Sequence, residues 1–266
     1  MAPPLDSLAR RRFSATGKDV SVLGLGTVKF GRNQGVKYPG GDGFSLPSDG
    51  EISSLLDLCI AHGVNLLDTA PAYGLAEERL GALLGARRKE FFIVTKTGEE
   101  FNGGKSHYDF SAAHTRMSVA RSLKRLRTDY LDCVLVHSDR DDLAVIERTP
   151  ALETLERLKQ DGRVLSYGVS TYTVAGGKRA AELADAVMVA YNQGHTAEKE
   201  VIDYAHARGK AVLVKKGLAS GHVGTLGGVE ENIRFILGTE GVTSLVFGSL
   251  SPANILNNIK AARETR

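Results

Sequence analysis

Short hydrophobic runs and amphipathic stretches alternate along nearly the whole chain, and each kind of stretch predicts its own element. The runs are rich in valine, leucine and isoleucine and are bounded by glycine or polar residues, which is typical of buried strands. Eight such runs predict strands at residues 20–26, 64–68, 91–96, 131–137, 164–170, 186–192, 210–215 and 244–248.

Between these runs, apolar residues recur three and four positions apart, which is the spacing of a helix that buries one face. Local signals mark the helix starts. Ser48 and Glu51 have the spacing of a capping box, and Thr149 and Pro150 suit an N-cap and a first helical position. We predict helices at about residues 51–62, 77–84, 111–127, 150–161, 175–183, 198–208 and 230–237, and a last helix that begins at Ser251 and Pro252.

This alternation predicts the fold. Strands that alternate with helices are parallel and are covered by those helices. Eight such units in 266 residues predict an α/β protein, a closed (β/α)8 TIM barrel that forms a single domain over residues 1–266. The alternative is an open, doubly wound sheet, which needs a glycine-rich dinucleotide fingerprint after its first strand. The nearest string, GLGTVKFG at residues 24–31, lacks that spacing, and we expect no helix directly after it.

Composition and charge exclude several classes of protein. The chain is 42% hydrophobic and 24% charged, unlike a disordered or collagen-like chain. Its net charge of +3 is spread out, whereas a nucleic-acid-binding protein gathers its basic residues in a patch. The N-terminal sequence lacks a signal-peptide core, and no run is long enough to span a bilayer. Cys59 and Cys133 lie in apolar stretches, which fits a reducing compartment. We expect a cytoplasmic protein that binds neither nucleic acid nor membrane, and its oligomeric state stays open.

Four polar side chains follow three neighbouring predicted strands. Asp68, Lys96 and His137 end the second, third and fourth strands, and Tyr73 lies in the loop after Asp68. Alone, each has an ordinary structural role, but barrel enzymes place their chemistry at the carboxyl ends of strands. A carboxylate neutralises a neighbouring buried ammonium, and an ammonium beside a phenol favours the phenolate. A histidine can then donate a hydrogen bond to a carbonyl oxygen. The sequence therefore predicts one catalytic site without a metal.

The chain resembles the aldo-keto reductase family. The strings that carry the resemblance are VLGLGTVKFG, GVNLLDTAPAYGLAEERLG, FIVTKTG, SLKRLRTDYLDCVLVHS, GRVLSYGVST and GSLSPANILNNI, which follow the family's order over about residues 18–262. The resemblance implies a (β/α)8 barrel that binds an extended nicotinamide cofactor without a Rossmann domain. It also implies a tetrad of Asp68, Tyr73, Lys96 and His137. In that reaction a hydride reaches a carbonyl carbon, Tyr73 donates the proton, Lys96 held by Asp68 tunes Tyr73, and His137 orients the carbonyl.

The resemblance also implies a set of cofactor contacts, and the chain departs from the family at several of them. Thr171 replaces a usual asparagine and Met188 a usual glutamine. Gly248 and Asn254 stand where NADPH-preferring members carry Lys and Arg, so we expect NADPH binding with an unusually small preference over NADH. The implied cofactor residues are Gly26, Thr27, Asp68, Ser170, Thr171, Met188, Lys215, Gly217, Leu218, Gly248, Ser249, Asn254, Asn257 and Asn258.

The substrate is expected to be a small carbonyl compound or sugar, held by aromatic residues of two loops. Residues 28–47 and 99–110 supply these candidates, namely Phe30, Tyr38, Phe44, Phe101, His107, Tyr108 and Phe110. Two other functions stay open. One is a Schiff-base aldolase that uses Lys96 as its nucleophile, and the other is a non-catalytic nicotinamide-binding module that reports redox state.

Overall fold

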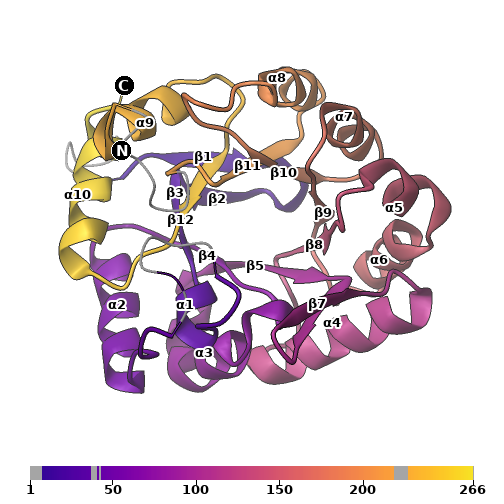
Figure 1. The fold of residues 1–266 in the computed structure, drawn as a ribbon, viewed down its shortest axis with the longest axis horizontal. Coiled ribbons are helices and arrows are strands. Elements are labelled where there is room, and N and C mark those ends of the chain that lie inside the picture. The colour runs from indigo at the N-terminus through magenta and orange to yellow at the C-terminus, as the bar shows by residue number, and fades with distance from the viewer. Residues whose placement is uncertain (1–7, 37–40, 42, 219–226, 266) are drawn as a thin grey trace.

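Eight parallel strands close into a barrel (Figure 1). The computed structural model describes residues 8–36, 41, 43–218 and 227–265. Around the barrel the strands are β3 (Leu23–Gly26), β4 (Leu66–Asp68), β5 (Phe92–Thr97), β8 (Cys133–His137), β9 (Tyr167–Ser170), β10 (Ala186–Ala190), β11 (Ala211–Lys215) and β12 (Ser244–Phe247). The last strand pairs with the first through Leu245 and Leu23, so the predicted barrel is confirmed and the open sheet is wrong.

Helices surround the barrel, as the apolar spacing predicted (Figure 1). The capping box of Ser48 and Glu51 is present, and Ser251 caps the last helix. One boundary is wrong, because Pro150 is itself the N-cap and Thr149 ends the preceding helix. The surrounding helices are α2 (Asp49–Ala61), α3 (Ala76–Leu84), α4 (Ala112–Leu126), α5 (Asp142–Arg148), α6 (Ala151–Gln160), α7 (Val174–Leu183), α8 (Lys199–His206), α9 (Val229–Leu237) and α10 (Pro252–Arg263).

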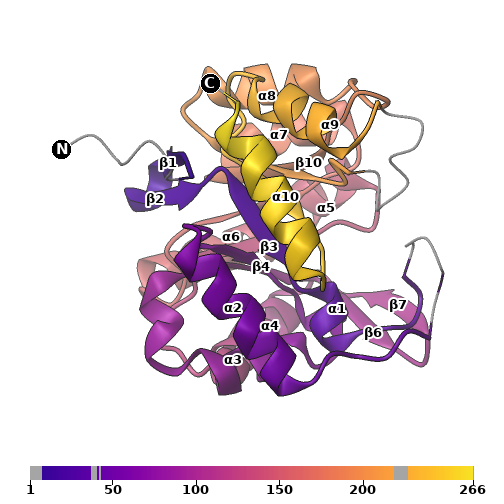
Figure 2. The ribbon, with the colours of Figure 1, turned by 90° about the vertical axis from the view of Figure 1, so that its left-hand side faces the viewer.

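The predicted first strand is two separate strands. Residues 18–21 form β2 (Lys18–Ser21), which pairs antiparallel with β1 (Arg10–Phe13), and only β3 enters the barrel. The β1–β2 hairpin lies at one end of the barrel, opposite the hairpin of β6 (Glu99–Asn102) and β7 (Lys105–Tyr108) (Figure 2). Phe13 and Val20 pack into the apolar cluster of the barrel interior. The N-terminal hairpin therefore plugs the end at which the barrel strands begin.

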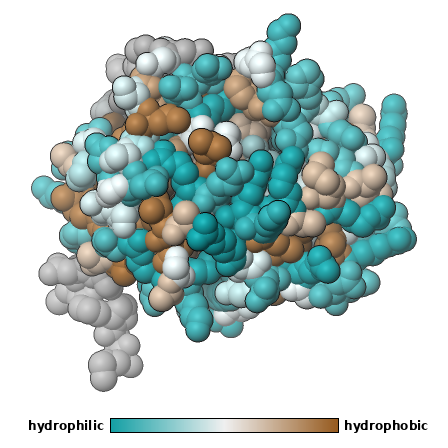
Figure 3. Space-filling view, turned by 90° about the horizontal axis from the view of Figure 1, so that it is seen from below, coloured by the Kyte–Doolittle hydropathy of each residue, from teal (hydrophilic) through white to brown (hydrophobic). Residues whose placement is uncertain are grey.

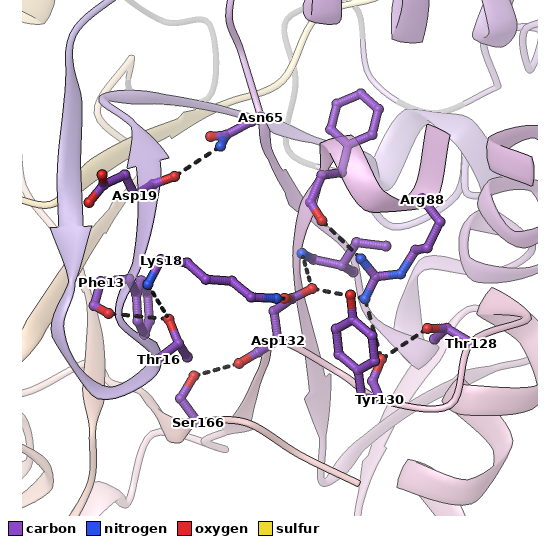
Figure 4. A network of polar contacts seen from close by, with 12 residues as sticks. Phe13, Thr16, Lys18, Asp19, Asn65, Arg88, Thr128, Tyr130, Asp132 and Ser166 are labelled. Carbon is purple, nitrogen blue, oxygen red and sulfur yellow. Dashed lines mark hydrogen bonds and ion pairs between the residues drawn. The ribbon is translucent and has the colours of Figure 1, made fainter. Parts of the chain in front are cut away.

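A buried carboxylate fastens this plug (Figure 4). Asp132 is fully buried just before β8. Its Oδ1 accepts a 2.6 Å hydrogen bond from Lys18 of β2, and its Oδ2 accepts bonds of 2.8 Å from Arg88 and 3.0 Å from the backbone N–H of Ile93. The carboxylate thus links the hairpin, the segment before β5 and the barrel at this end.

A one-turn helix, α1 (Val28–Gly31), follows β3 inside the string at residues 24–31, and in the described residues no helix comes directly after that string, as expected. This helix touches the short 3-10 turn η2 (Pro71–Tyr73) after β4 at a very close approach. A Cβ on Gly74 would lie 2.2 Å from the carbonyl oxygen of Gly31, and Gly74 has a φ of +61°. Only glycine fits there, and the contact fixes the loop that carries Tyr73.

The surface shows scattered rather than gathered hydrophobic residues. On the face in Figure 3, hydrophobic residues form small separate patches between hydrophilic ones. The large exposed hydrophobic residues include Leu75 on the loop before α3 and Met117 on α4. Cys59 and Cys133 are buried, and burial raises the pKa of both thiols to about 12. Within the described ranges, every helix is too short or too polar to cross a membrane.

Candidate active site

Neighbouring strands β4 and β5 bring Asp68 and Lys96 into contact. The Nζ of Lys96 donates a 2.6 Å hydrogen bond to Oδ1 of Asp68 and a 3.0 Å bond to the carbonyl oxygen of Thr69. Lys96 is 2% exposed and Asp68 is 5% exposed. The ammonium is therefore neutralised and held in one position by the end of the neighbouring strand β4.

Tyr73 lies against this pair. The turn η2 carries it back over the end of β4, and the Nζ of Lys96 lies 4.8 Å from the centre of its ring. Tyr73 and Asp68 both line a cavity of about 630 Å³, whereas Lys96 lies behind them. The ammonium is thus placed to stabilise negative charge on the phenol from the protein side of the cavity.

His137 at the end of β8 joins the same cavity and contacts Glu99. Its Nδ1 lies 2.5 Å from Oε2 of Glu99, the first residue of β6. Burial raises the pKa of Glu99, but the hydrogen bond and charge of His137, with help from Ser106 and Arg32, lower it to about 2. Burial lowers the pKa of His137, and Glu99 opposes this shift. The pair therefore joins a carboxylate to an imidazole that burial keeps neutral.

Most of the predicted site residues line the cavity. Beside the tetrad members, its lining includes the glycines that end β3, follow β11 and follow β12, together with polar residues at the start of α10. The predicted residues in the lining are Gly26, Asp68, Tyr73, His137, Lys215, Gly217, Leu218, Gly248, Ser249, Asn254, Asn257 and Asn258.

Four of the predicted cofactor residues lie outside this lining. Thr27 donates from Oγ1 to the carbonyl oxygen of Asp68. Ser170 and Thr171 are fully buried at the end of β9, and Oγ1 of Thr171 is buried without a hydrogen-bond partner in the described part of the chain. Met188 packs inside the barrel and is 1% exposed. The structure thus gives Met188 a core position instead of the expected place in the cavity wall.

Lys215 lines the cavity and also contacts the end of β9. Its Nζ donates a 2.8 Å hydrogen bond to Oγ of Ser170 and lies 4.2 Å from the ring centre of Tyr172. Burial of the ammonium lowers its pKa to about 7, and the charges of Lys216 and Lys96 add to this shift. Lys215 therefore lines the same cavity as Gly217 and Leu218 and contacts the end of β9.

The aromatic residues that were expected to form the pocket wall lie partly in the core and partly at the rim of the barrel. Phe30 is fully buried, so its predicted place in the pocket wall is wrong. Phe101 lies under the guanidinium of Arg32, at 3.3 Å from its ring centre. Tyr108 is 41% exposed and stacks on Phe110 at 6.1 Å. Tyr38 lies outside the described residues.

Sequence reasoning missed several residues of the site. Tyr172 and Lys29 line the cavity, and Glu99 contacts His137. Two of them, Tyr172 and Glu99, could have been found from the sequence. Tyr172 directly follows the predicted pair at the end of β9, and Glu99 begins a hairpin whose turn is the glycine pair at residues 103–104. The hairpin folds back over the strand ends, which brings Glu99 to the site.

The lining of the cavity suits a nicotinamide dinucleotide. The lining runs from Tyr73 and His137 to Ser249 and Asn254 at the start of α10. The amino end of a helix and lysine ammonium groups both favour phosphate. The buried Oγ1 of Thr171 has no hydrogen-bond partner among the described residues, but Thr171 lies outside the cavity lining. The residues present therefore fit the cofactor that the resemblance implied.

Comparison with known proteins places the chain in a family. The model of the aldo/keto reductase family matches residues 22–228. The chain therefore belongs to the aldo/keto reductase family, whose members are oxidoreductases that bind nicotinamide cofactors and act on small molecules. The resemblance seen in the sequence is thereby confirmed.

Individual relatives agree with this assignment. A crystal structure from Pseudomonas aeruginosa, assigned to the aldo-keto reductases, is 45% identical, covers 98% of this chain and 97% of that one, and has a TM-score of 0.88. The D-arabinose 1-dehydrogenase of Saccharomyces cerevisiae is 34% identical over 48% of this chain and 38% of its own length. The L-galactose dehydrogenase of Arabidopsis thaliana is 32% identical over 60% of this chain and 47% of its own. The chain thus spans less than half the length of these two curated relatives.

Proposed function

We propose that this protein is a nicotinamide-dependent oxidoreductase that interconverts aldehydes, ketones or sugars with the corresponding alcohols or oxidised sugars by hydride transfer. The observation that carries this proposal is the buried pair of Lys96 and Asp68 directly beside the ring of Tyr73 on the cavity wall. Membership of the family supports the class of reaction. The names of the yeast and plant relatives support sugars as substrates.

Tyr73 is the proposed acid and base of the site. A bound nicotinamide supplies the hydride in reduction and accepts it in oxidation. In reduction the hydroxyl of Tyr73 gives its proton to the substrate oxygen, and in oxidation the phenolate takes that proton back. The nearby ammonium of Lys96 stabilises the phenolate by its charge. Asp68 keeps Lys96 charged and fixes its position.

The cofactor residues are proposed from their places around the cavity. Ser170 and Thr171 offer hydroxyl groups near the tetrad, and the asparagines at the start of α10 offer neutral amides at the far end. A 2′-phosphate is usually met there by arginine or lysine, whereas Asn254 is neutral and Glu230 adds a carboxylate to the lining. We therefore propose NADPH as the cofactor, with a small preference over NADH.

The two alternative functions make different demands on the site. A Schiff-base aldolase needs an unprotonated lysine, but Asp68 lies 2.6 Å from Nζ of Lys96 and favours the ammonium. A non-catalytic redox reporter needs no proton donor, yet the tetrad residues stand together around one cavity wall. The arrangement supports a catalyst over both alternatives.

A spectrophotometric panel tests the proposal. The purified protein is mixed with NADPH or NADH and a range of aldehydes, ketones and sugars, and with NADP or NAD and the matching alcohols and sugars. We expect turnover with at least one pair, and its loss in Tyr73→Phe. Cofactor binding without turnover over the whole panel would support the redox reporter, and trapping of a substrate on Lys96 by borohydride would support the aldolase.

A further inference from the structure

The side chain of Lys215 reaches across the mouth of the barrel. Lys215 ends β11 and Ser170 ends β9, and β10 lies between these two strands (Figure 1). The Nζ of Lys215 donates a 2.8 Å hydrogen bond to Oγ of Ser170. Ser170 is in register with His137, the last residue of the neighbouring strand β8. The ammonium therefore lies beside the strand end that carries His137, on the side of the barrel away from β12 and α10.

Three cations surround the ring of Tyr172, which lines the cavity together with Lys215 and Lys216. The ring centre lies 4.2 Å from Nζ of Lys215, 5.3 Å from Cζ of Arg140 and 5.4 Å from Nζ of Lys216. At distances below about 6 Å a cation is attracted to the face of an aromatic ring. Among the residues that the structure describes, the ammonium of Lys215 contacts a hydroxyl and this ring rather than a carboxylate.

Positive charge exceeds negative charge around Lys215. The pKa of Lys215 is lowered to about 7, first by burial and then by the charges of Lys216 and Lys96, while Asp142 and Glu198 offset this only in part. Asp142 already accepts hydrogen bonds from two backbone N–H groups and one hydroxyl. An anion bound beside Lys215 would favour its charged form. The place is therefore suited to a negatively charged group that enters from the cavity.

We infer that Lys215 is a substrate-binding residue, and that the site selects carbonyl compounds and sugars that carry a carboxylate, such as oxo acids and sugar acids. The inference rests on the proposed function and deepens it. The reacting group of the substrate faces Tyr73 and His137, and its carboxylate accepts hydrogen bonds from Nζ of Lys215 and from the hydroxyl of Tyr172. One ammonium matches the single charge of a carboxylate, whereas a phosphate group carries close to two charges.

Matched substrates test this preference. Para-formylbenzoate and para-formylbenzamide have nearly the same shape and differ in charge, and succinic semialdehyde and its amide form the aliphatic pair. In the wild-type protein, kcat/KM should favour the acid over the amide about ten- to a hundredfold, the weight of one charge-assisted hydrogen bond. Turnover of both pairs without preference for the acid would overturn the inference and leave the proposed function standing.

A variant shows whether Lys215 causes the preference. Lys215→Met removes the charge and keeps a chain of similar length. The ratio of kcat/KM for acid and amide should fall by about ten- to a hundredfold in this variant. The ratio is the useful quantity, because a change in folding or in cofactor binding affects both substrates alike. Lys89→Met, at an exposed position, is the control and should keep the wild-type ratio. The same ratio in Lys215→Met as in the wild type would contradict the inference.

Binding without turnover separates this inference from the proposed function and from a role in cofactor binding. In titration calorimetry, succinate should bind Lys215→Met at least about tenfold more weakly than the wild type, with or without NADP. If NADP abolishes the binding of succinate, Lys215 serves the phosphates of the cofactor and the inference is wrong. Binding of succinate that depends on Lys215, in a protein without any turnover, would reject the proposed function and keep the carboxylate site.

Discussion

The Nζ of Lys215 donates a 2.8 Å hydrogen bond to Oγ of Ser170, across the strand that separates β11 from β9. The ring of Tyr172 covers the ammonium at 4.2 Å. A second lysine thus stands at the rim of the barrel, and in the described part of the chain it has no ion pair such as the one that Lys96 makes with Asp68 at 2.6 Å. The charge of Lys215 is therefore less well compensated than the charge of Lys96. As a consequence, the stability of the protein should depend on pH.

Lys215→Met should stabilise the protein at low and neutral pH. Burial lowers the pKa of Lys215 from 10.5 to about 7 in the folded state, so the unfolded chain binds more protons between these values. The wild-type protein therefore gains stability as pH rises from about 7 toward 10.5, and the variant lacks this gain.

Thermal unfolding from pH 6 to pH 10 checks this expectation. At pH 6 the variant should exceed the wild type by at least about 1 kcal/mol, or about 2–4 °C in Tm, and the difference should shrink toward pH 10. Lys89→Met, at an exposed position, is the control and should show no such pH dependence. A constant difference at all pH values would mean that Lys215 stays charged throughout.

Tyr73→Phe should remove the proton donor and keep the ring in place. General acid catalysis contributes about 10²–10⁴-fold, so kcat should fall by that amount. Cofactor affinity should change little, because the ring still packs against its loop. Cofactor titration and steady-state kinetics measure the two effects, and Tyr130→Phe at the opposite end of the barrel is the control. Reduction at the wild-type rate by Tyr73→Phe would shift the donor role to another residue.

Asn254→Arg should raise the preference for NADPH. The residue lines the cavity at the start of α10, where an arginine can pair with the 2′-phosphate. Such a pair is worth about ten- to a hundredfold in affinity, so NADPH should bind more tightly while NADH binds as before. Leu256→Arg adds the same charge on α10 outside the cavity lining and should change neither. A wild-type preference for NADPH above about a thousandfold, roughly 4 kcal/mol, would show that a basic residue already reaches the phosphate.

Asp132→Asn should lower the stability of the protein and leave its catalytic rate unchanged. The carboxylate neutralises Lys18 and Arg88 at the end of the barrel away from the tetrad, and removal of one partner from a buried ion pair costs about 3–5 kcal/mol. The free energy of unfolding in urea should fall by that amount. At a temperature where the variant is folded, kcat should match the wild type. Asp129→Asn, an exposed neighbour, should be neutral in both assays, and a loss of kcat in Asp132→Asn would mean that the plug affects the opposite rim.

The sequence by itself determined the barrel and which side chains meet at the carboxyl ends of its strands. Hydrophobic spacing reports which face of each element is buried, and the spacing along this chain alternates between strand and helix through eight units. Because all barrel strands are parallel, their carboxyl ends share one rim. Asp68, Lys96 and His137 could therefore be placed together from their positions in the chain alone, and Tyr73 from the short loop that follows Asp68.

Only the tertiary structure decided how side chains far apart in sequence meet. The plug depends on a contact between Lys18 and Asp132, which are 114 positions apart, and local spacing carries no information about such a pair. The contact of Glu99 with His137 depends on how the β6–β7 hairpin folds over the rim. The direction of Lys215 and the inward packing of Met188 depend on where each strand sits in the closed barrel. Periodicity fixes the elements, but barrel closure and loop packing fix which polar groups face one another.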